Sequence, residues 1–240
     1  MMDRVFKVFV DFDGTITIED TGDAIFTRFG DTGFVQGVIK DLLNDRISAR
    51  ECWVKLCESV AHINKNELDD FILKLEIDET FHSFVDYCNK HGIKLYVLSD
   101  GFDYYIDLIF RREKLNHLTV FSNKLKIDER NKMIPSFPFY DSGCTSSANC
   151  KRNHIINNSG DDEFTIFIGD GNSDKYTVQF CDFIFAKKDL LKYCEKERIS
   201  YFPFNDFNDV TARMDTLRQK KRLKKRHQAE LKRQTLYINE

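Results

Sequence analysis

The residues best suited to chemistry stand where an apolar run ends, at Asp11-Phe12-Asp13-Gly14-Thr15. The preceding run, Val8-Phe9-Val10, is typical of a buried strand, and open α/β sheets bind ligands beyond the carboxyl ends of their strands. Gly14 permits a sharp turn or a close approach to a ligand, and the Thr15 hydroxyl can donate to an anion. An isolated sequence of this kind is also compatible with an ordinary turn, so the rest of the chain must supply the context.

Two later apolar runs also end in polar sequences. The run Ile93–Leu98 leads into Ser99-Asp100-Gly101, and a helix beginning near Phe102 would offer its N-terminal N–H groups to an anion. Alternatively, Ser99 is an ordinary helix cap. The run Phe164–Ile168 leads into Gly169-Asp170-Gly171-Asn172-Ser173-Asp174. Carboxylates from two strand ends are the ligands that Mg²⁺ prefers, together with phosphate oxygens of a substrate.

A lysine and a pair of cysteines precede the last of these runs. Lys151 opens a short predicted helix, where the helix dipole disfavours a cation, so an anionic neighbour is indicated. Cys144 and Cys150 lie in a polar loop and could bind a metal or form a disulfide, although their spacing matches no common zinc pattern. The seven cysteines as a whole favour reduced, buried thiols.

The elements that position these residues alternate between strands and helices, which predicts a doubly wound, mainly parallel α/β sheet. Apolar residues at helical spacing fill about sixty residues after the first strand, more than one crossover helix needs. The expected helices are 20–29, 33–43, 48–60 and 65–75, with a capping box at Ser48 and Glu51. We therefore expect a helical cap at 17–77, inserted into a Rossmann-like core formed by 1–16 and 78–212.

The remaining elements complete the expected sheet. A core helix beginning near Phe81 should end at a glycine C-cap, Gly92. A short strand is expected at 118–122, followed by a hairpin at 124–139 that turns around Arg130-Asn131. The last strands are expected at 182–186 and 199–202.

Composition and charge bound the class of protein. The chain has 240 residues, of which 42% are hydrophobic and 22 are phenylalanine, enough for a substantial core. It contains no apolar run of about 18 residues and no signal-peptide pattern, which favours a cytoplasmic protein without a membrane span. Residues 213–240 hold ten Lys and Arg against three acids, and we expect a partly solvated basic helix there.

Taken in order, the motifs at Asp11, Ser99, Lys151 and Asp170 resemble those of the haloacid dehalogenase superfamily of phosphatases, over residues 5 to about 210. The resemblance implies a Mg²⁺-dependent phosphomonoesterase acting on a small phosphorylated metabolite. It implies that Asp11 is the nucleophile that forms an aspartyl-phosphate and that Asp13 is the general acid and base. The implied metal ligands are Asp11, Asp13 through its carbonyl oxygen, and Asp170. The implied phosphate-binding and supporting residues are Thr15, Ser99, Asp100, Gly101, Lys151, Asn172 and Asp174.

More specific resemblances, to groups within this superfamily, concern the substrate. The helical cap and Leu98-Ser99-Asp100-Gly101-Phe102-Asp103 resemble the phosphoserine-phosphatase-like branch, in which a glutamate after the first motif and a cap arginine hold the amino acid. Here Asp20 stands near the glutamate position, and the segment around Trp53 offers no clear arginine. The loop before Lys151 and the stretch 199–204 are similar to the ketone-enol phosphatases of bacterial methionine salvage. Substrate selection is expected from cap side chains near Asp20, Phe26, Phe29 and Trp53.

Three alternatives remain open at this point. One is a phosphoserine phosphatase. A second is a phosphotransferase or mutase of the same fold, which would pass the phosphoryl group to an alcohol instead of water. A third is a non-catalytic protein whose basic tail binds nucleic acid, but carboxylates at three strand ends argue against such a scaffold. The sequence does not fix the oligomeric state.

Overall fold

In the computed structural model, which describes residues 4–144 and 147–239, the chain forms two compact units. The core unit comprises 4–16, 77–98 and 151–239, and the cap unit comprises 17–76, 99–144 and 147–150. The sequence placed 99–150 with the core, whereas the structure groups that segment with the helices of 17–76. Residues 1–3 and 240 of the predicted domains, and 145–146 of the predicted loop, lie outside the described residues.

The core unit is built on parallel strands. Its strand order is β2-β1-β5-β6-β7, and every pair in that order is parallel. These strands are β1 (Phe6–Asp11), β2 (Lys94–Phe102), β5 (Phe164–Gly169), β6 (Phe183–Ala186) and β7 (Phe202–Pro203). The last four residues of β2 belong to the cap unit. Since β1 pairs with β2 on one side and β5 on the other, its carboxyl end is a topological switch point, where doubly wound sheets bind ligands.

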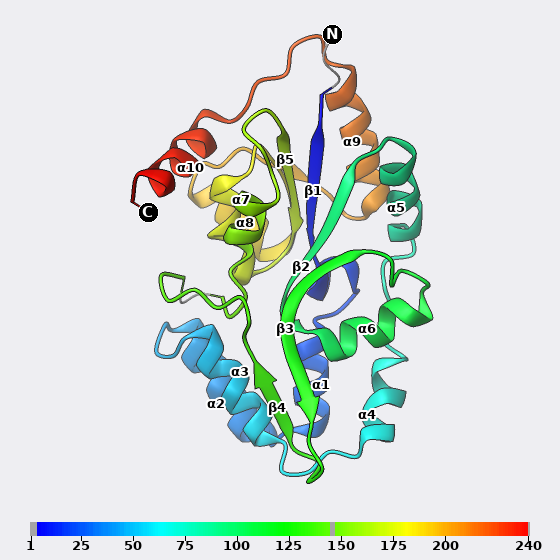
Figure 1. Ribbon diagram of the computed structural model, residues 1–240. Coiled ribbons are helices and arrows are strands. Elements are labelled where there is room, and N and C mark those ends of the chain that lie inside the picture. The colour runs from blue at the N-terminus through cyan, green and yellow to red at the C-terminus, as the bar shows by residue number, and fades with distance from the viewer. Residues whose placement is uncertain (1–3, 145–146, 240) are drawn as a thin grey trace. The chain divides into compact units, whose positions relative to one another are not determined.

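Helices cover both sides of these strands. In Figure 1, α5 (Phe81–Lys90) and α9 (Phe207–Gln219) lie to the right of β1, and α7 (Lys151–Asn157) and α8 (Lys188–Lys196) lie to its left. Gly92 follows α5 with a φ of 63°, as expected for a glycine C-cap. Buried side chains of the strands form the core beneath the helices, and those of Val8, Phe9, Val10, Ile166, Phe167 and Ile168 are 0% exposed.

The cap unit contains four helices before β2 and a hairpin after it, among the residues described. The helices are α1 (Thr21–Phe29), α2 (Thr32–Leu43), α3 (Ala49–Ser59) and α4 (Lys65–Ile72). The predicted capping box is confirmed, since Ser48 and Glu51 exchange side-chain and backbone hydrogen bonds at the start of α3. After β2 come α6 (Asp103–Arg112), β3 (Thr119–Ile127) and β4 (Met133–Ser136).

Two details of the sheet differ from prediction. The strand expected at 118–122 and the first arm of the hairpin are one strand, β3, which pairs antiparallel with β4. Ser122 and Asn123 are both buried in the middle of this strand, and no turn separates the two segments. The last predicted strand, 199–202, is displaced to Phe202–Pro203 because 197–199 complete the C-terminal turn of α8.

The basic tail is divided between two helices, whereas its charge pattern predicted one partly solvated helix. Residues 213–219 complete α9, 220–226 are not helical, and α10 spans His227–Asn239. Arg233 is buried and donates to Asp182 at 3.0 Å. Arg226 donates to the carbonyl oxygens of Val178 and Gln179 at 2.6 and 2.7 Å. These arginines therefore attach the tail to the core unit, through partners distant in sequence.

Candidate active site

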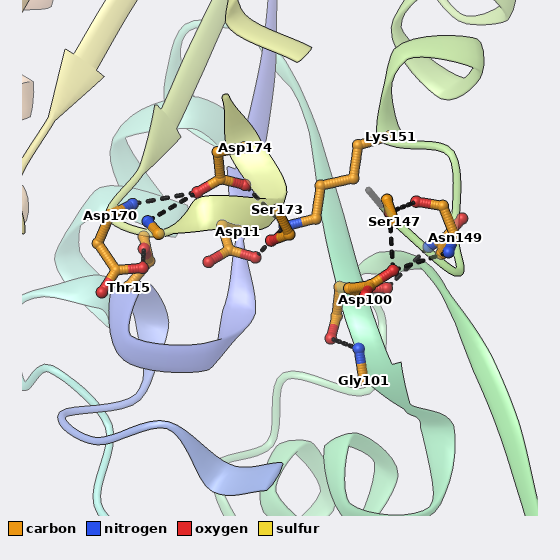
Figure 2. Close-up of polar contacts among 12 residues, drawn as sticks. Asp11, Thr15, Asp100, Gly101, Ser147, Asn149, Lys151, Asp170, Ser173 and Asp174 are labelled. Carbon is orange, nitrogen blue, oxygen red and sulfur yellow. Dashed lines mark hydrogen bonds and ion pairs between the residues drawn. The ribbon is translucent and has the colours of Figure 1, made fainter. Parts of the chain in front are cut away.

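Three short segments of the core unit bring ionised groups to one end of its strands (Figure 2). Asp11 is the last residue of β1, and Asp170 directly follows β5. Asp174 ends the short helical turn η2 (Asn172–Asp174), and Lys151 is the first residue of α7. Because parallel strands end at the same edge of a sheet, residues 159 positions apart in the chain meet there.

Lys151 is the cation at the centre of this cluster. Its side chain is 0% exposed, and its Nζ donates to Asp11 Oδ1, to Asp174 Oδ1 at 2.7 Å and to Ser173 Oγ at 3.1 Å. Three acceptors match the three N–H bonds of an ammonium group. The anionic neighbour that its place at a helix start indicated is therefore present.

Asp174 braces the backbone as well as the lysine. Its Oδ2 accepts from the backbone N–H groups of Asp170 and Gly171, each at 3.2 Å. A Cβ on Gly169 would lie 2.4 Å from this oxygen, so only glycine leaves room for the carboxylate. The glycine and the aspartate together fix the turn that presents Asp170.

Asp170 joins the first motif to a residue that the sequence analysis missed. Its Oδ1 accepts from the Thr15 hydroxyl at 3.1 Å, and its Oδ2 accepts from Lys188 Nζ at 2.8 Å. Gly14 turns there with a φ of 73°, and a Cβ on it would lie 2.5 Å from Asp170 Oδ2. Lys188 also donates to the Gly14 carbonyl oxygen at 3.0 Å. The sequence signals for Lys188 were its position soon after the strand β6 and at the start of the helix α8 (Lys188–Lys196).

Burial and crowding alter the protonation of the cluster. Burial, together with the carboxylates of Asp174 and Asp170, raises the pKa of Asp11 well above its usual value. Burial also raises the pKa of Asp174. Burial alone would lower the pKa of Lys151, but the adjacent carboxylates of Asp11 and Asp174 outweigh it and raise the pKa. The lysine is therefore cationic, whereas further positive charge would stabilise the ionised forms of Asp11 and Asp174.

The carboxylates are suited to a divalent cation. Asp11, Asp170 and Asp174 each offer one carboxylate oxygen, and these three oxygens lie within 4.8 Å of one another. Mg²⁺ prefers such hard oxygen donors and normally keeps several waters. The ligand set implied by the resemblance shares Asp11 and Asp170 with this cluster. Asp13 is half-buried in the turn after β1. It was expected to bind the metal through its carbonyl oxygen and not through its side chain.

In the cap unit, Asp100 holds a loop. Its Oδ1 accepts from Ser147 Oγ at 2.7 Å and from the backbone N–H groups of Ala148 and Asn149 at 2.6 and 2.7 Å. Its Oδ2 accepts from Trp53 Nε1 at 3.2 Å. Both oxygens thus accept hydrogen bonds within the cap unit, and the expected role of this side chain in binding phosphate stays a prediction.

Ser99 and Gly101 lie beside this loop. Ser99 is buried, its Oγ accepts from the Gly101 N–H at 2.9 Å, and its carbonyl oxygen accepts from Asn149 Nδ2 at 2.8 Å. A serine hydroxyl can both accept and donate a hydrogen bond. Hydrogen bonds to Asp100 and Ser99 hold the loop that precedes Lys151. Cys144 and Cys150 in this loop are buried thiols.

Two other predicted site residues are exposed to solvent. Asp20 is exposed and is the N-cap of α1, where its side chain accepts from the Asp23 N–H at 2.8 Å. Asn172 is exposed in the turn that leads to Asp174. Neither contact identifies a bound substrate.

Comparisons with known proteins identify the family of this chain. The family model described as "Putative Phosphatase" matches residues 6–203. The chain is 30% identical to Pdp3-interacting factor 1 of Schizosaccharomyces pombe over 222 residues, which cover 85% of this chain and 92% of that protein. It is 30% identical over 212 residues to the 2-hydroxy-3-keto-5-methylthiopentenyl-1-phosphate phosphatase of Bacillus cereus, covering 85% of this chain and 93% of that enzyme.

Solved structures show the same fold at lower identity. A phosphoserine phosphatase with a phospho-aspartyl intermediate analogue aligns with a TM-score of 0.66 and 17% identity, over 88% of this chain and 99% of that chain. A substrate-bound phosphoserine phosphatase complex aligns with a TM-score of 0.67 and 17% identity, over 89% and 99%.

The family match and the curated phosphatase relative define the chain as a phosphomonoester hydrolase, and its fold is that of the phosphoserine phosphatase structures. The chain belongs to the phosphatase family whose model spans residues 6–203. The α/β fold and the enzyme class expected from the sequence are thereby confirmed. Among the described residues, no helix is both long enough and apolar enough to cross a membrane.

Proposed function

We propose that this phosphatase hydrolyses a small phosphorylated metabolite through an aspartyl-phosphate on Asp11, with Mg²⁺ as cofactor. The observation that carries the proposal is the buried Lys151 ammonium held between Asp11 and Asp174, with Asp170 in the same cluster. Ion clusters that are costly to bury are expected where a charged substrate must be bound.

The reaction divides into two displacements. An Asp11 carboxylate oxygen attacks phosphorus as the bond from phosphorus to the ester oxygen breaks, and Asp13 gives its proton to the departing alkoxide. Asp13 then takes a proton from a water molecule that attacks the same phosphorus and releases Asp11. Lys151 holds Asp11 in position and places its charge beside the transferring group.

The metal would be held by Asp11 and Asp170, with Asp13 contributing its carbonyl oxygen and Asp174 as a further nearby carboxylate. When bound, Mg²⁺ supplies positive charge that offsets the phosphoryl oxygens and keeps Asp11 ionised. Without it, three carboxylates face the ammonium groups of Lys151 and Lys188, which leaves one negative charge if all five groups are ionised. This net negative charge would repel a phosphate dianion.

Ser99 is proposed to donate its hydroxyl proton to the phosphoryl group, with Gly101 shaping the turn. This role rests on the resemblance and on the buried serine that follows Leu98, the register partner of Asp11. Thr15 is proposed to support the site through Asp170, and Asn172 to shape the turn to Asp174. Asp20 is not proposed to bind substrate through its helix-capping oxygen.

For the substrate we propose a methylthio-substituted sugar-derived phosphate of the methionine-salvage type ahead of phosphoserine. The relative from Bacillus cereus, named for such a substrate, supports this choice. The cap offers Trp53 in contact with Phe26 and Phe102, with ring centroids 5.9 and 4.9 Å apart, which favours an apolar group over a charged amino acid. We propose a cytoplasmic location, in keeping with seven buried thiols.

A panel of phosphate esters tests the proposal. Purified protein with Mg²⁺ should release phosphate from 4-nitrophenyl phosphate and fastest from the methionine-salvage ester, with phosphoserine slower. A competing alcohol should not capture the phosphoryl group, which separates a hydrolase from a phosphotransferase. Phosphate release that is equal in Asp11→Asn would contradict the proposed nucleophile.

A further inference from the structure

Lys188, which contacts Asp170, has a backbone position that is unfavourable for a lysine. It is the first residue of α8, where the helix dipole disfavours a cation, and its φ of 48° lies in the left-handed region that non-glycine residues rarely adopt. Two backbone hydrogen bonds tie this helix start to the Asp170 turn: Leu190 N–H donates to the Asp170 carbonyl oxygen at 2.8 Å, and Lys187 N–H donates to the Gly169 carbonyl oxygen at 3.2 Å. These hydrogen bonds hold the start of α8 beside the cluster, although the positive φ and the cation at the helix N-terminus are unfavourable.

The two acceptors of Lys188 are oxygens of the kind that a divalent cation takes. Its Nζ lies 2.8 Å from Asp170 Oδ2 and 3.0 Å from the Gly14 carbonyl oxygen. The other Asp170 oxygen, Oδ1, accepts from the Thr15 hydroxyl. A cation that binds Asp170 through Oδ2 must therefore compete with this ammonium group.

The two lysines of the cluster differ in their freedom to leave. The Lys151 side chain is 0% exposed and contacts three groups of the cluster, whereas the Lys188 side chain is 52% exposed. A half-exposed lysine can turn its amine into water at little cost, since its charge is then solvated. Lys151 is a fixed member of the site, and Lys188 can exchange.

We propose that Lys188 is an exchangeable counter-ion of Asp170, which neutralises this carboxylate in the metal-free enzyme and gives it up when a divalent cation binds. The inference rests on the proposed function, because it assigns Asp170 to the metal. It makes Lys188 a residue that sets metal affinity: the ammonium group weakens cation binding while keeping the Asp170 carboxylate in place. Removing the amine should tighten metal binding.

The test is direct cation binding to the full-length protein, by calorimetry with Mg²⁺ and by electron paramagnetic resonance of free Mn²⁺. Lys188→Gln should lower the dissociation constant about tenfold, the size expected for loss of one partly screened charge beside a cation ligand. Lys188→Gly should do the same and should fold at least as well as wild type, since glycine accepts the positive φ. Lys188→Arg keeps the charge and should stay within about threefold of wild type.

Lys192→Gln is the matched control, because Lys192 lies on the same helix and pairs with Asp189 at 2.9 Å in an exposed position. Its dissociation constant should stay within about twofold of wild type. Equal or weaker cation binding in both Lys188→Gln and Lys188→Gly would overturn the inference while leaving the proposed function intact. Cation binding that persists unchanged in Asp170→Asn would overturn both.

Discussion

Two aspartate centres of this molecule are built on opposite principles. In the core unit, Asp11, Asp170 and Asp174 are held by the charged amines of Lys151 and Lys188. In the cap unit, Asp100 is held by neutral donors: one hydroxyl, two backbone N–H groups and an indole N–H.

The difference indicates what each centre can do. The hydroxyl and backbone N–H donors to the Asp100 carboxylate come from the 147–149 loop, so this centre stabilises one conformation of that loop. In the core cluster, burial raises the pKa values of Asp11 and Asp174, so a further cation would stabilise their ionised forms. The first centre should therefore matter for stability, and the second for catalysis.

The largest expected effect is that of Asp11→Asn. The amide cannot form an acyl phosphate as the carboxylate does, so turnover of 4-nitrophenyl phosphate should fall by at least about 10⁴-fold. The circular dichroism spectrum should be retained, because the side-chain amide oxygen of the variant can still accept from Lys151. Turnover within tenfold of wild type would show that Asp11 is not the nucleophile.

Asp13→Asn should have a smaller effect on catalysis. It removes the proposed general acid and base, which accounts for about 10²- to 10⁴-fold in rate. The loss should be greatest for an ester with a poor leaving group and smaller for 4-nitrophenyl phosphate, whose phenolate needs little protonation. Equal losses with both esters would argue against proton donation by Asp13.

The cap centre should respond in stability instead. Asp100→Ala removes the acceptor for Ala148 and Asn149 and should lower the free energy of unfolding by about 3 kcal/mol. Asp141→Ala, which removes one acceptor from an exposed turn, is the control and should cost less than about 1 kcal/mol. Urea unfolding of both variants measures the difference, and equal values would contradict the role assigned to Asp100.

A buried histidine of the core unit gives a pH-dependent effect. Burial lowers the pKa of His154 from 6.5 to about 4, so the folded protein resists protonation that the unfolded chain accepts. This contribution to stability is fully present above pH 6.5 and is lost as pH falls toward 4. His154→Leu should abolish a pH dependence of about 3 kcal/mol in this window, measured by urea unfolding. A parallel pH profile in the variant would be inconsistent with a neutral buried imidazole.

The smallest expected effect is that of Trp53→Phe. Phenylalanine keeps the aromatic contacts with Phe26 and Phe102 but loses the N–H that donates to Asp100. Stability should fall by about 1 kcal/mol, since the Ser147 hydroxyl and the backbone N–H groups of Ala148 and Asn149 still donate to Asp100. A loss as large as that of Asp100→Ala would mean that the indole, and not the loop, is the main partner of this carboxylate.

The sequence predicted the part of the site that lies at strand ends. Asp11 and Asp170 follow long apolar runs, and Lys151 opens a helix, so their positions follow from local pattern alone. Lys188 also opens a helix, α8, but no helix was predicted there, so the signal that applies to Lys151 was not recognised for Lys188. The role of Asp100 depends on a loop 47 to 49 residues later in the chain, and no periodicity reports such a contact.

The fold shows the same division between local and distant information. Helices and the parallel strands were predicted because their apolar spacing is local. The attachment of the basic tail was missed because Arg233 meets Asp182, 51 residues earlier, and charge counts do not identify partners. The grouping of 99–150 with 17–76 likewise depends on packing between segments far apart in sequence.

The most direct test of the metal-dependent core cluster is the rate of 4-nitrophenyl phosphate hydrolysis by wild type and Asp170→Asn, after chelation and after Mg²⁺ is restored. The account predicts that wild type loses turnover in the chelator and regains it with Mg²⁺, whereas Asp170→Asn stays inactive at Mg²⁺ concentrations that saturate wild type. Full turnover of the chelated wild type, or of Asp170→Asn without added metal, would contradict it.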